Sequence, residues 1–343
     1  MISECTKELC ILSLNINGLS SKLEQASAVA WLCKYDIVFL SELKCNYTFS
    51  IPGFMVIRSQ ITPGEMRGGV AILFKSFIFP YIYDIETEYD QIWFRFQYMP
   101  NTVFCAVYIP PSDSPFFSPD SFATLHSNAC KANQETVIIG DLNARLPLLS
   151  QFDDHFNTVQ YQMNVDSQCN KNGRTLCDLC LACDICPINH LKYMDSIFPG
   201  GLTFRKGTTW ISQLDWALVS KNSLKNVKCF NIIHQLPIAT DHAALELKLG
   251  NLSCSISHLA ERVKYLGESY IQQTKFMKRP IPFHTIDPIK VQYNLPDTAE
   301  LWELDSVEQM CEEITERLYG TALAAKKSEH QPVTRNLNTA HDR

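Results

Sequence analysis

Several short, apolar segments of the chain end in a polar residue, and this pattern limits the folds that the chain can adopt. The segments at 9–15, 36–42 and 135–141 are dominated by aliphatic residues before a final Asn, Glu or Asp, which predicts strands buried on both faces of a sheet. Helical spacing follows the first of them, at 21–34. Alternating strands and helices predict a mixed α/β fold, with sheets packed together and helices outside. Further strands are expected at 68–74, 91–97, 102–109, 212–220 and 242–249, and a further helix at 118–133.

The patterned part of the chain ends near Gly250, and the remaining residues differ from it. Two segments within 251–343 have helical spacing, and a Pro-punctuated stretch separates them. The last residues, 328–343, are polar and are expected to be disordered. The sequence therefore predicts one domain over 1–250, followed by a helical, linker-like appendage over 251–343 with a disordered tail.

Composition narrows the class of protein. Apolar residues make up 46% of the chain, enough for a large core, but no run of about 18 of them predicts a membrane span. The first residues lack a signal-peptide pattern, so an intracellular location is expected and the 14 cysteines are interpreted as free thiols. A formal charge of −6 argues against a DNA-coating protein. It does not exclude a nucleic-acid enzyme, because metal-dependent active sites are rich in carboxylates.

The polar residues at the strand ends are the candidate functional residues, because such positions face the loops that form a cleft. Each one alone is typical of a turn or a helix cap, but six such segments in one chain indicate an active site. A further Asp–His pair, in DDH at 153–155, precedes no apolar strand and is interpreted as a loop outside the site. The residues that mark the six segments are Asn15, Asn17, Glu42, Tyr108, Asp141, Asn143, Asp215, Asp241 and His242.

The order of these motifs carries a family resemblance. Seven motifs, spread in this order over about residues 9–249, resemble the endonuclease/exonuclease/phosphatase superfamily. They are LNING, SELK, RGGVAIL, VYIPP, IIGDLNARL, SQLDWALV and TDHAAL. The resemblance is greatest to the apurinic/apyrimidinic-type endonuclease domain of non-LTR (LINE-type) retrotransposons. It implies a four-layered sandwich, in which two packed mixed β-sheets are flanked by helices. It also implies a metal-dependent phosphodiester hydrolase that uses Mg²⁺, with Mn²⁺ as the alternative metal.

The resemblance assigns three residues to the metal. Glu42 is expected to be the direct ligand, with Asn17 and Asp241 nearby. Oxygen ligands of this kind suit Mg²⁺, which keeps several of its waters. A divalent metal can stabilise the charge that develops on a phosphate and on a leaving oxygen.

The resemblance assigns the remaining residues to catalysis and phosphate binding. His242 is expected to bind the scissile phosphate or transfer a proton, with its imidazole oriented by Asp215. Asp141 is expected to position or deprotonate the attacking water, and Asn143 to orient Asp141 and bind a phosphate oxygen. The motif TDH differs from the commoner SDH, but the threonine retains the hydroxyl. Asn15, Tyr108 and Thr203 are the further expected phosphate or DNA contacts.

Several functions agree with these residues. The first is a DNA endonuclease of a LINE-type retrotransposon that nicks double-stranded DNA and leaves a 3′-hydroxyl to prime reverse transcription. The alternatives are an abasic-site repair endonuclease, another phosphohydrolase of the superfamily, and a truncated inactive remnant. The chain has no YADD-type polymerase motif, so a partner reverse transcriptase domain would lie outside it. A DNA substrate implies a nuclear location, and no membrane partner is expected.

One motif remains outside this set. CDLCLACDIC, at 177–186, is one residue short of a bacterial iron–sulfur run and suggests a cluster-binding or zinc-binding loop. The alternative is a helix, because Leu176, Leu179, Cys180 and Cys183 share one apolar sector at 100° per residue. We favour the helix, which follows an NG-x-x-L pattern that is recurrent in the same family.

Overall fold

The computed structural model describes residues 8–19, 22–23, 25–45, 47–59, 68–131, 135–146 and 149–252. The predicted appendage at 251–343 therefore lies outside the described residues, apart from its first two positions. Within the described ranges, no helix is long and apolar enough to cross a membrane.

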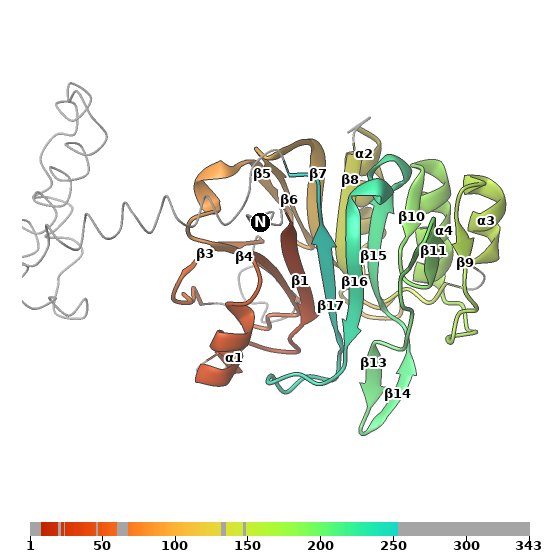
Figure 1. Ribbon diagram of the computed structural model, residues 1–343. Coiled ribbons are helices and arrows are strands. Elements are labelled where there is room, and N and C mark those ends of the chain that lie inside the picture. The colour runs from red at the N-terminus through yellow and green to blue at the C-terminus, as the bar shows by residue number, and fades with distance from the viewer. Residues whose placement is uncertain are drawn as a thin grey trace, which may run out of the picture. The chain divides into compact units, whose positions relative to one another are not determined.

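Two six-stranded sheets form the centre of the protein (Figure 1). In the first sheet, β1 pairs parallel with β2 and antiparallel with β17. The strand order is β16-β17-β1-β2-β4-β3, with β1 at Leu9–Asn15, β2 at Ile37–Ser41, β3 at Phe54–Arg58, β4 at Val70–Lys75, β16 at Val227–Ile233 and β17 at Ala244–Leu249.

In the second sheet, β7 and β8 are parallel, and the other pairs are antiparallel. Its order is β10-β15-β8-β7-β6-β5, with β5 at Ile82–Thr87, β6 at Gln91–Phe96, β7 at Met99–Tyr108, β8 at Glu135–Asp141, β10 at Ile185–Pro187 and β15 at Asp215–Ser220. Smaller pairings join β9 (Gln160–Tyr161), β11 (Leu191–Tyr193) and β12 (Ser196–Ile197), and separately β13 (Phe204–Lys206) and β14 (Thr209–Ser212).

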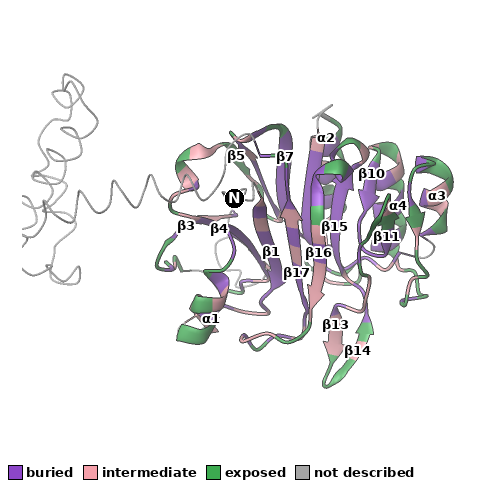
Figure 2. Cartoon of the chain, viewed as in Figure 1, coloured by how far each residue is buried: buried purple, intermediate pink, exposed green. Residues whose placement is uncertain are grey.

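The two sheets pack face to face through aromatic side chains. Phe94 of β6 meets Phe74 of β4 at 5.0 Å and Phe39 of β2 at 6.1 Å between ring centroids. Phe94 also stacks on Phe104 of its own sheet. Burial of these rings drives the two sheets together, and Figure 2 shows their strands mostly buried.

Helices cover the outer faces of the sheets. Ala28 and Leu32 of α1 (Ala26–Leu32) share a core cluster with Leu12 and Leu14 of β1, on the outer face of the first sheet. The other helices, α2 (Pro119–Lys131), α3 (Ser150–Phe156) and α4 (Lys171–Ala182), belong to the core of the second sheet. The predicted sandwich of two mixed sheets between helices is confirmed.

Within the two six-stranded sheets, the strands that the sequence did not predict are edge strands. β3 and β5 are the outermost strands on one side of their sheets and β16 is outermost on the other, and all three are only partly buried. Partial burial removes the continuous apolar composition that marked the central strands.

The prediction that the DDH segment at 153–155 lies in a loop is wrong. It lies in α3, where Asp153 accepts from the backbone N–H of Tyr161 and His155 contacts Asp184.

The cysteine run spans three environments. Cys177 and Cys180 are buried on α4, which confirms the helix and its core-facing side. Cys186 is buried in β10. Cys183 ends α4 and is only half-buried. The run therefore does not surround a common point.

Candidate active site

The carboxyl ends of the parallel strands of both sheets meet, and this brings the predicted residues together. Asn15 ends β1 and donates from Nδ2 to Asp141 Oδ2, at the end of β8 in the other sheet, over 2.8 Å. Glu42 follows β2 and accepts from the hydroxyl of Tyr108, at the end of β7, over 2.9 Å. Two hydrogen bonds thus join the same edge of the two sheets.

Asp141 is buried and held by three donors. Besides Asn15, it accepts from the backbone N–H of Asn143 at 2.9 Å and from Asn143 Nδ2 at 3.2 Å. Asn143 has a φ of +46°, a conformation that asparagine tolerates better than most residues. Burial first, and the nearby charge of Asp215 second, raise the pKa of Asp141 to about 7. Such a carboxylate can accept a proton near neutral pH.

His242 and Asp215 form a buried pair beside Asp141. His242 Nδ1 lies 2.9 Å from Asp215 Oδ2, and Asp215 pairs with Asp141 across the β15–β8 ladder. Burial alone would lower the pKa of His242, but the charge and hydrogen bond of Asp215 outweigh it and raise the pKa to about 10. Asp215 occupies Nδ1, which leaves Nε2 for a substrate.

A second group of side chains, next to this cluster, carries oxygen atoms that can bind a metal ion. Asn17 Nδ2 donates to Asp241 Oδ1 at 2.8 Å. Lys44 Nζ lies 2.6 Å from Asn17 Oδ1 and 3.2 Å from Glu42 Oε2, so an ammonium group bridges two of the predicted metal ligands. A cation therefore already fits between these oxygens. Glu42, Asn17 and Asp241 supply the carboxylate and carbonyl oxygens that Mg²⁺ prefers, so the residues fit the metal that the fold family implies.

Two threonines hold this arrangement in place. Thr240 donates its hydroxyl to the backbone oxygen of Asn15 and accepts from the backbone N–H of His242. Thr203 is fully buried, and its hydroxyl accepts from the backbone N–H groups of Leu214 and Asp215. The predicted phosphate contact of Thr203 therefore has no support in this geometry, and its hydroxyl fixes the start of β15 instead.

The beginning of α4 braces the loop that carries Asp141 and Asn143. Asn170 caps the helix through Gly173 and also accepts from the backbone N–H of Arg145. Its Nδ2 donates to the backbone oxygen of Asn143. Asn172, fully buried, donates to the backbone oxygens of Leu142 and Pro110. The NG-x-x-L pattern thus anchors the helix to the loop.

Two cavities open on the site. Glu42, Tyr108 and Lys44 line one of about 700 Å³. His242 and Thr240 line the other, of about 420 Å³. The β13–β14 hairpin lies at this second cavity, since Phe204 forms a bridge with His242, and it projects from the body of the fold (Figure 1).

The structure brings together the side chains of all the predicted site residues except Thr203, whose hydroxyl bonds to the backbone of Leu214 and Asp215 instead. Sequence reasoning missed some of the residues that support them. Lys44 is part of the quoted motif SELK, and its cationic side chain next to Glu42 was a usable signal. Asn172 also carried a signal, as the first residue of the NG-x-x-L pattern. Asn170 carried none, because its role depends on how α4 meets the loop. The gathered residues are Asn15, Asn17, Glu42, Tyr108, Asp141, Asn143, Asp215, Asp241 and His242.

Solved structures of nucleic-acid enzymes are similar to this chain. The AP endonuclease LMAP from Leishmania major has 13% sequence identity and a TM-score of 0.54, covering 71% of this chain and 88% of that one. A variant of the 3′ phosphatase NExo from Neisseria, bound to a product DNA hairpin, has 16% identity and a TM-score of 0.52, covering 70% and 99%. The endonuclease domain of TRAS1, a telomere-specific non-LTR retrotransposon, has 14% identity and a TM-score of 0.47, covering 71% and 98%. No curated protein sequence matches the chain.

Fold and site define a metal-dependent phosphodiester hydrolase. Residues 12–242 match the Endonuclease/Exonuclease/phosphatase family, and the chain belongs to that family. The resemblance noted in the sequence motifs is confirmed.

Proposed function

We propose that the chain is a Mg²⁺-dependent DNA endonuclease of the LINE-type retrotransposon class, which nicks one strand and leaves a 3′-hydroxyl. The observation that carries the proposal is the buried Asp141 cluster beside the Asp215–His242 pair, with an oxygen-donor group adjoining both. The motif order of the sequence supports the retrotransposon class. A reverse transcriptase domain outside this chain would use the 3′-hydroxyl, and the DNA substrate implies a nuclear location.

The proposed reaction assigns a step to each group. Asp141, held by Asn15 and Asn143, orients a water and takes its proton as the water oxygen attacks phosphorus. The P–O3′ bond breaks, and the leaving oxygen takes a proton from solvent water to become the 3′-hydroxyl, while the phosphate stays on the 5′ side.

His242 donates from Nε2 to a phosphate oxygen, because Asp215 holds Nδ1. Tyr108 lines the other cavity and donates its hydroxyl to Glu42 in this structure, and it would turn that hydroxyl to the same phosphate when substrate binds. Glu42, Asn17 and Asp241 would hold Mg²⁺. When bound, Mg²⁺ supplies positive charge at the phosphate and the leaving oxygen.

Duplex DNA as the substrate is supported by the β13–β14 hairpin. Arg205 and Lys206 lie on this hairpin, and Arg205 lines the same cavity as His242. The Arg205 guanidinium lies 5.7 Å from the centre of the Trp210 ring. A chain with a formal charge of −6 needs such local cations to bind a polyanion. Named neighbours of the fold agree with this substrate: one is an AP endonuclease, and another is bound to a product DNA hairpin.

A plasmid assay tests the proposal. The purified chain is expected to convert supercoiled plasmid to the nicked form with Mg²⁺, and the nick should prime a DNA polymerase without phosphatase treatment. His242→Ala and Glu42→Gln should each abolish nicking, while the exposed controls His155→Ala and Glu86→Gln retain it. Absence of nicking with both Mg²⁺ and Mn²⁺, or nicking that survives both site variants, would refute the nuclease.

A second assay separates the proposed class from a repair enzyme. Matched duplexes with and without one abasic analogue should be cut at similar rates by the proposed endonuclease. Strong preference for the abasic duplex would instead identify an abasic-site endonuclease, which is the alternative function.

A further inference from the structure

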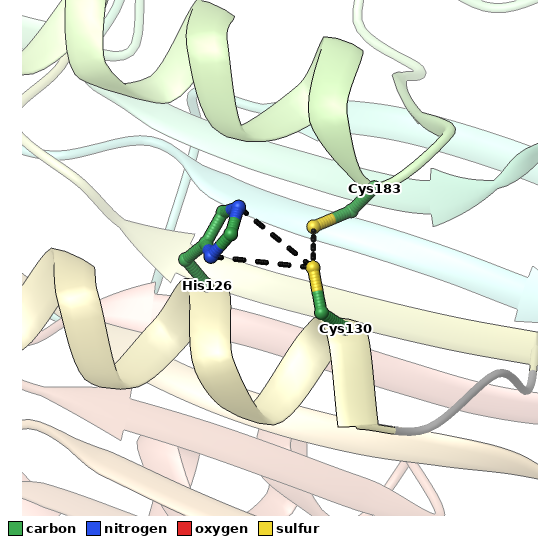
Figure 3. Close-up of side chains that lie close together, drawn as sticks. All are labelled: His126, Cys130 and Cys183. Atoms are coloured by element: carbon green, nitrogen blue, oxygen red, sulfur yellow. Dashed lines mark hydrogen bonds between the residues drawn. The ribbon is translucent and has the colours of Figure 1, made fainter.

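Cys183, the one cysteine of the 177–186 run that ends a helix, faces two other potential metal ligands. Figure 3 shows His126 and Cys130 of α2 pointing toward it. Cys130 Sγ lies 2.8 Å from Cys183 Sγ, and 3.7 Å from Nε2 of His126. The ligand atoms of all three residues lie within 4.8 Å of one another. The family match and the catalytic site give these three residues no role.

We propose that His126, Cys130 and Cys183 bind a borderline-soft divalent cation of the zinc class. Soft thiolates together with an imidazole select zinc over Mg²⁺. The i, i+4 spacing of His126 and Cys130 places both side chains on one face of α2. The proposal concerns a second site and does not depend on DNA cleavage.

The distances are close to those that a tetrahedral zinc ion needs. Zn–S bonds of about 2.3 Å and Zn–N bonds of about 2.0–2.1 Å place two sulfurs roughly 3.8 Å apart, and a sulfur and a nitrogen roughly 3.6 Å apart. The observed separation of 3.7 Å between Cys130 and His126 already agrees. The two sulfurs need to move apart by about 1 Å, which the exposed Cys130 side chain can provide by a small rotation.

The surroundings allow an ion to enter. Cys130 and Cys183 line a surface cavity of about 590 Å³, together with the carboxylates Glu135 and Asp184. Three protein ligands leave a fourth position open to water from this cavity. Because His126 and Cys130 are exposed, ion binding does not require the core to open.

The site lies far from the catalytic residues. Glu135, beside it, begins β8, whereas Asp141 ends the same strand. Six residue steps along a strand span roughly 20 Å. The cation would therefore not take part in the reaction. It would join α2 to α4, two helices on the outer side of the second sheet, across 53 positions of sequence.

A disulfide between Cys130 and Cys183 is the competing interpretation. Their sulfur separation of 2.8 Å exceeds a disulfide bond of about 2.05 Å. His126 decides between the two, because an imidazole beside the sulfurs completes a metal site and has no part in a disulfide. Mass spectrometry of the intact, unreduced chain detects the disulfide directly.

Cobalt substitution tests the site. The full chain, reduced and stripped of metal with a chelator, is titrated with Co²⁺ and then with Zn²⁺. One equivalent of Co²⁺ should bind with thiolate-to-cobalt charge-transfer absorption, which Zn²⁺ then removes. Cys130→Ser and Cys183→Ser should lose this absorption, and His126→Ala should bind at least tenfold more weakly. Cys33→Ser and Cys169→Ser, at exposed cysteines outside the group, are the matched controls and should bind normally.

Stability gives a second measurement. Zn²⁺ that binds only the folded chain should raise the thermal midpoint of the parent and of Glu42→Gln equally, and should not raise that of Cys130→Ser. Circular dichroism checks that the variants are folded. Should Cys183→Ser fail to fold, the exposed Cys130→Ser still carries the test. The proposal would be overturned if both cysteine variants still bound cobalt through thiolates. It would also be overturned if the chain formed a Cys130–Cys183 disulfide and bound no Co²⁺ after reduction.

Discussion

Replacing Gly173 with alanine is expected to destabilise the protein and to impair catalysis, although alanine is the better helix former. Gly173 lies in the first turn of α4 and is buried against the loop that follows β8. A Cβ at this position would lie 1.9 Å from the backbone oxygen of Arg145 and 2.6 Å from its carbonyl carbon. Backbone atoms cannot rotate away, so the helix or the loop must move by more than 1 Å, roughly the difference from ordinary van der Waals contact.

The magnitude follows from three contributions. Overpacking a tight site costs about 1–3 kcal/mol. Movement of α4 also stretches the two bonds that Asn170 makes to Arg145 and Asn143, each worth about 1 kcal/mol. Helix propensity offsets about 1 kcal/mol in the opposite direction. The free energy of unfolding should therefore fall by about 2–4 kcal/mol. Because Asn143 orients Asp141, displacement of its loop by about 1 Å should slow nicking by about 10²-fold.

Urea denaturation of the parent and of Gly173→Ala, followed by circular dichroism, measures the first effect, and plasmid nicking measures the second. Gly201→Ala is the matched control, because its Cβ would meet only Ile232 at an ordinary 3.6 Å. That control should be nearly neutral. A Gly173→Ala protein that is as stable as the parent, or more stable, would show that helix propensity governs this position and would refute the argument from close approach.

Three further predictions concern the charges of the site. Lys44→Met should tighten Mg²⁺ binding two- to fivefold, about 0.5–1 kcal/mol, because the ammonium group no longer competes for Glu42 and Asn17. Calorimetry measures this affinity, and weaker Mg²⁺ binding by the variant would contradict the prediction. Glu42→Gln should weaken Mg²⁺ binding in the same titration, since it removes a charged ligand, and unchanged affinity would place the metal elsewhere. In the metal-free protein, burial and the charge of Asp215 raise the pKa of Asp141 to about 7, so the folded state favours the protonated carboxyl. Its contribution to the free energy of unfolding is therefore fully present below about pH 4 and is lost as the pH rises through about 7. Relative to the parent, Asp141→Asn should therefore gain stability over this range, on the order of a few kcal/mol in urea melts, and a difference that does not change with pH would exclude the linkage.

The central strands were predictable because burial on both faces leaves a continuous apolar composition. β1, β2 and β8 carry that signal, whereas β5 is partly exposed along its length and does not. The residue types of the site were equally visible, since each lies within or close to the start or end of a predicted strand. No single strand's sequence predicts that the ends of the two sheets meet. The link from Asn15 to Asp141 spans 126 positions and depends on how the sheets pack.

Thr203 shows why position in the sequence does not give a role. It lies near Asp215 along the chain, and a hydroxyl near the proposed catalytic pair suits a phosphate contact. Its side chain instead points into the protein and accepts from the backbone of Asp215. Only the direction of a side chain separates these roles, and the irregular segment before β13 has no periodicity from which to predict that direction.

The cysteine run shows how spacing misleads and still carries information. On a helix with 100° per residue, a repeat of three residues turns each successive side chain by about 60° away from the previous one. The three cysteines therefore spread over about 120° of the helix, and Cys177 and Cys180 are buried in the core. Cys183 lies in the same apolar sector as Leu176, but it is only half-buried because α4 ends there, beside α2. The run that first resembled an iron–sulfur loop is therefore core packing at Cys177 and Cys180, and the end of α4 brings the Cys183 thiol within reach of His126 and Cys130.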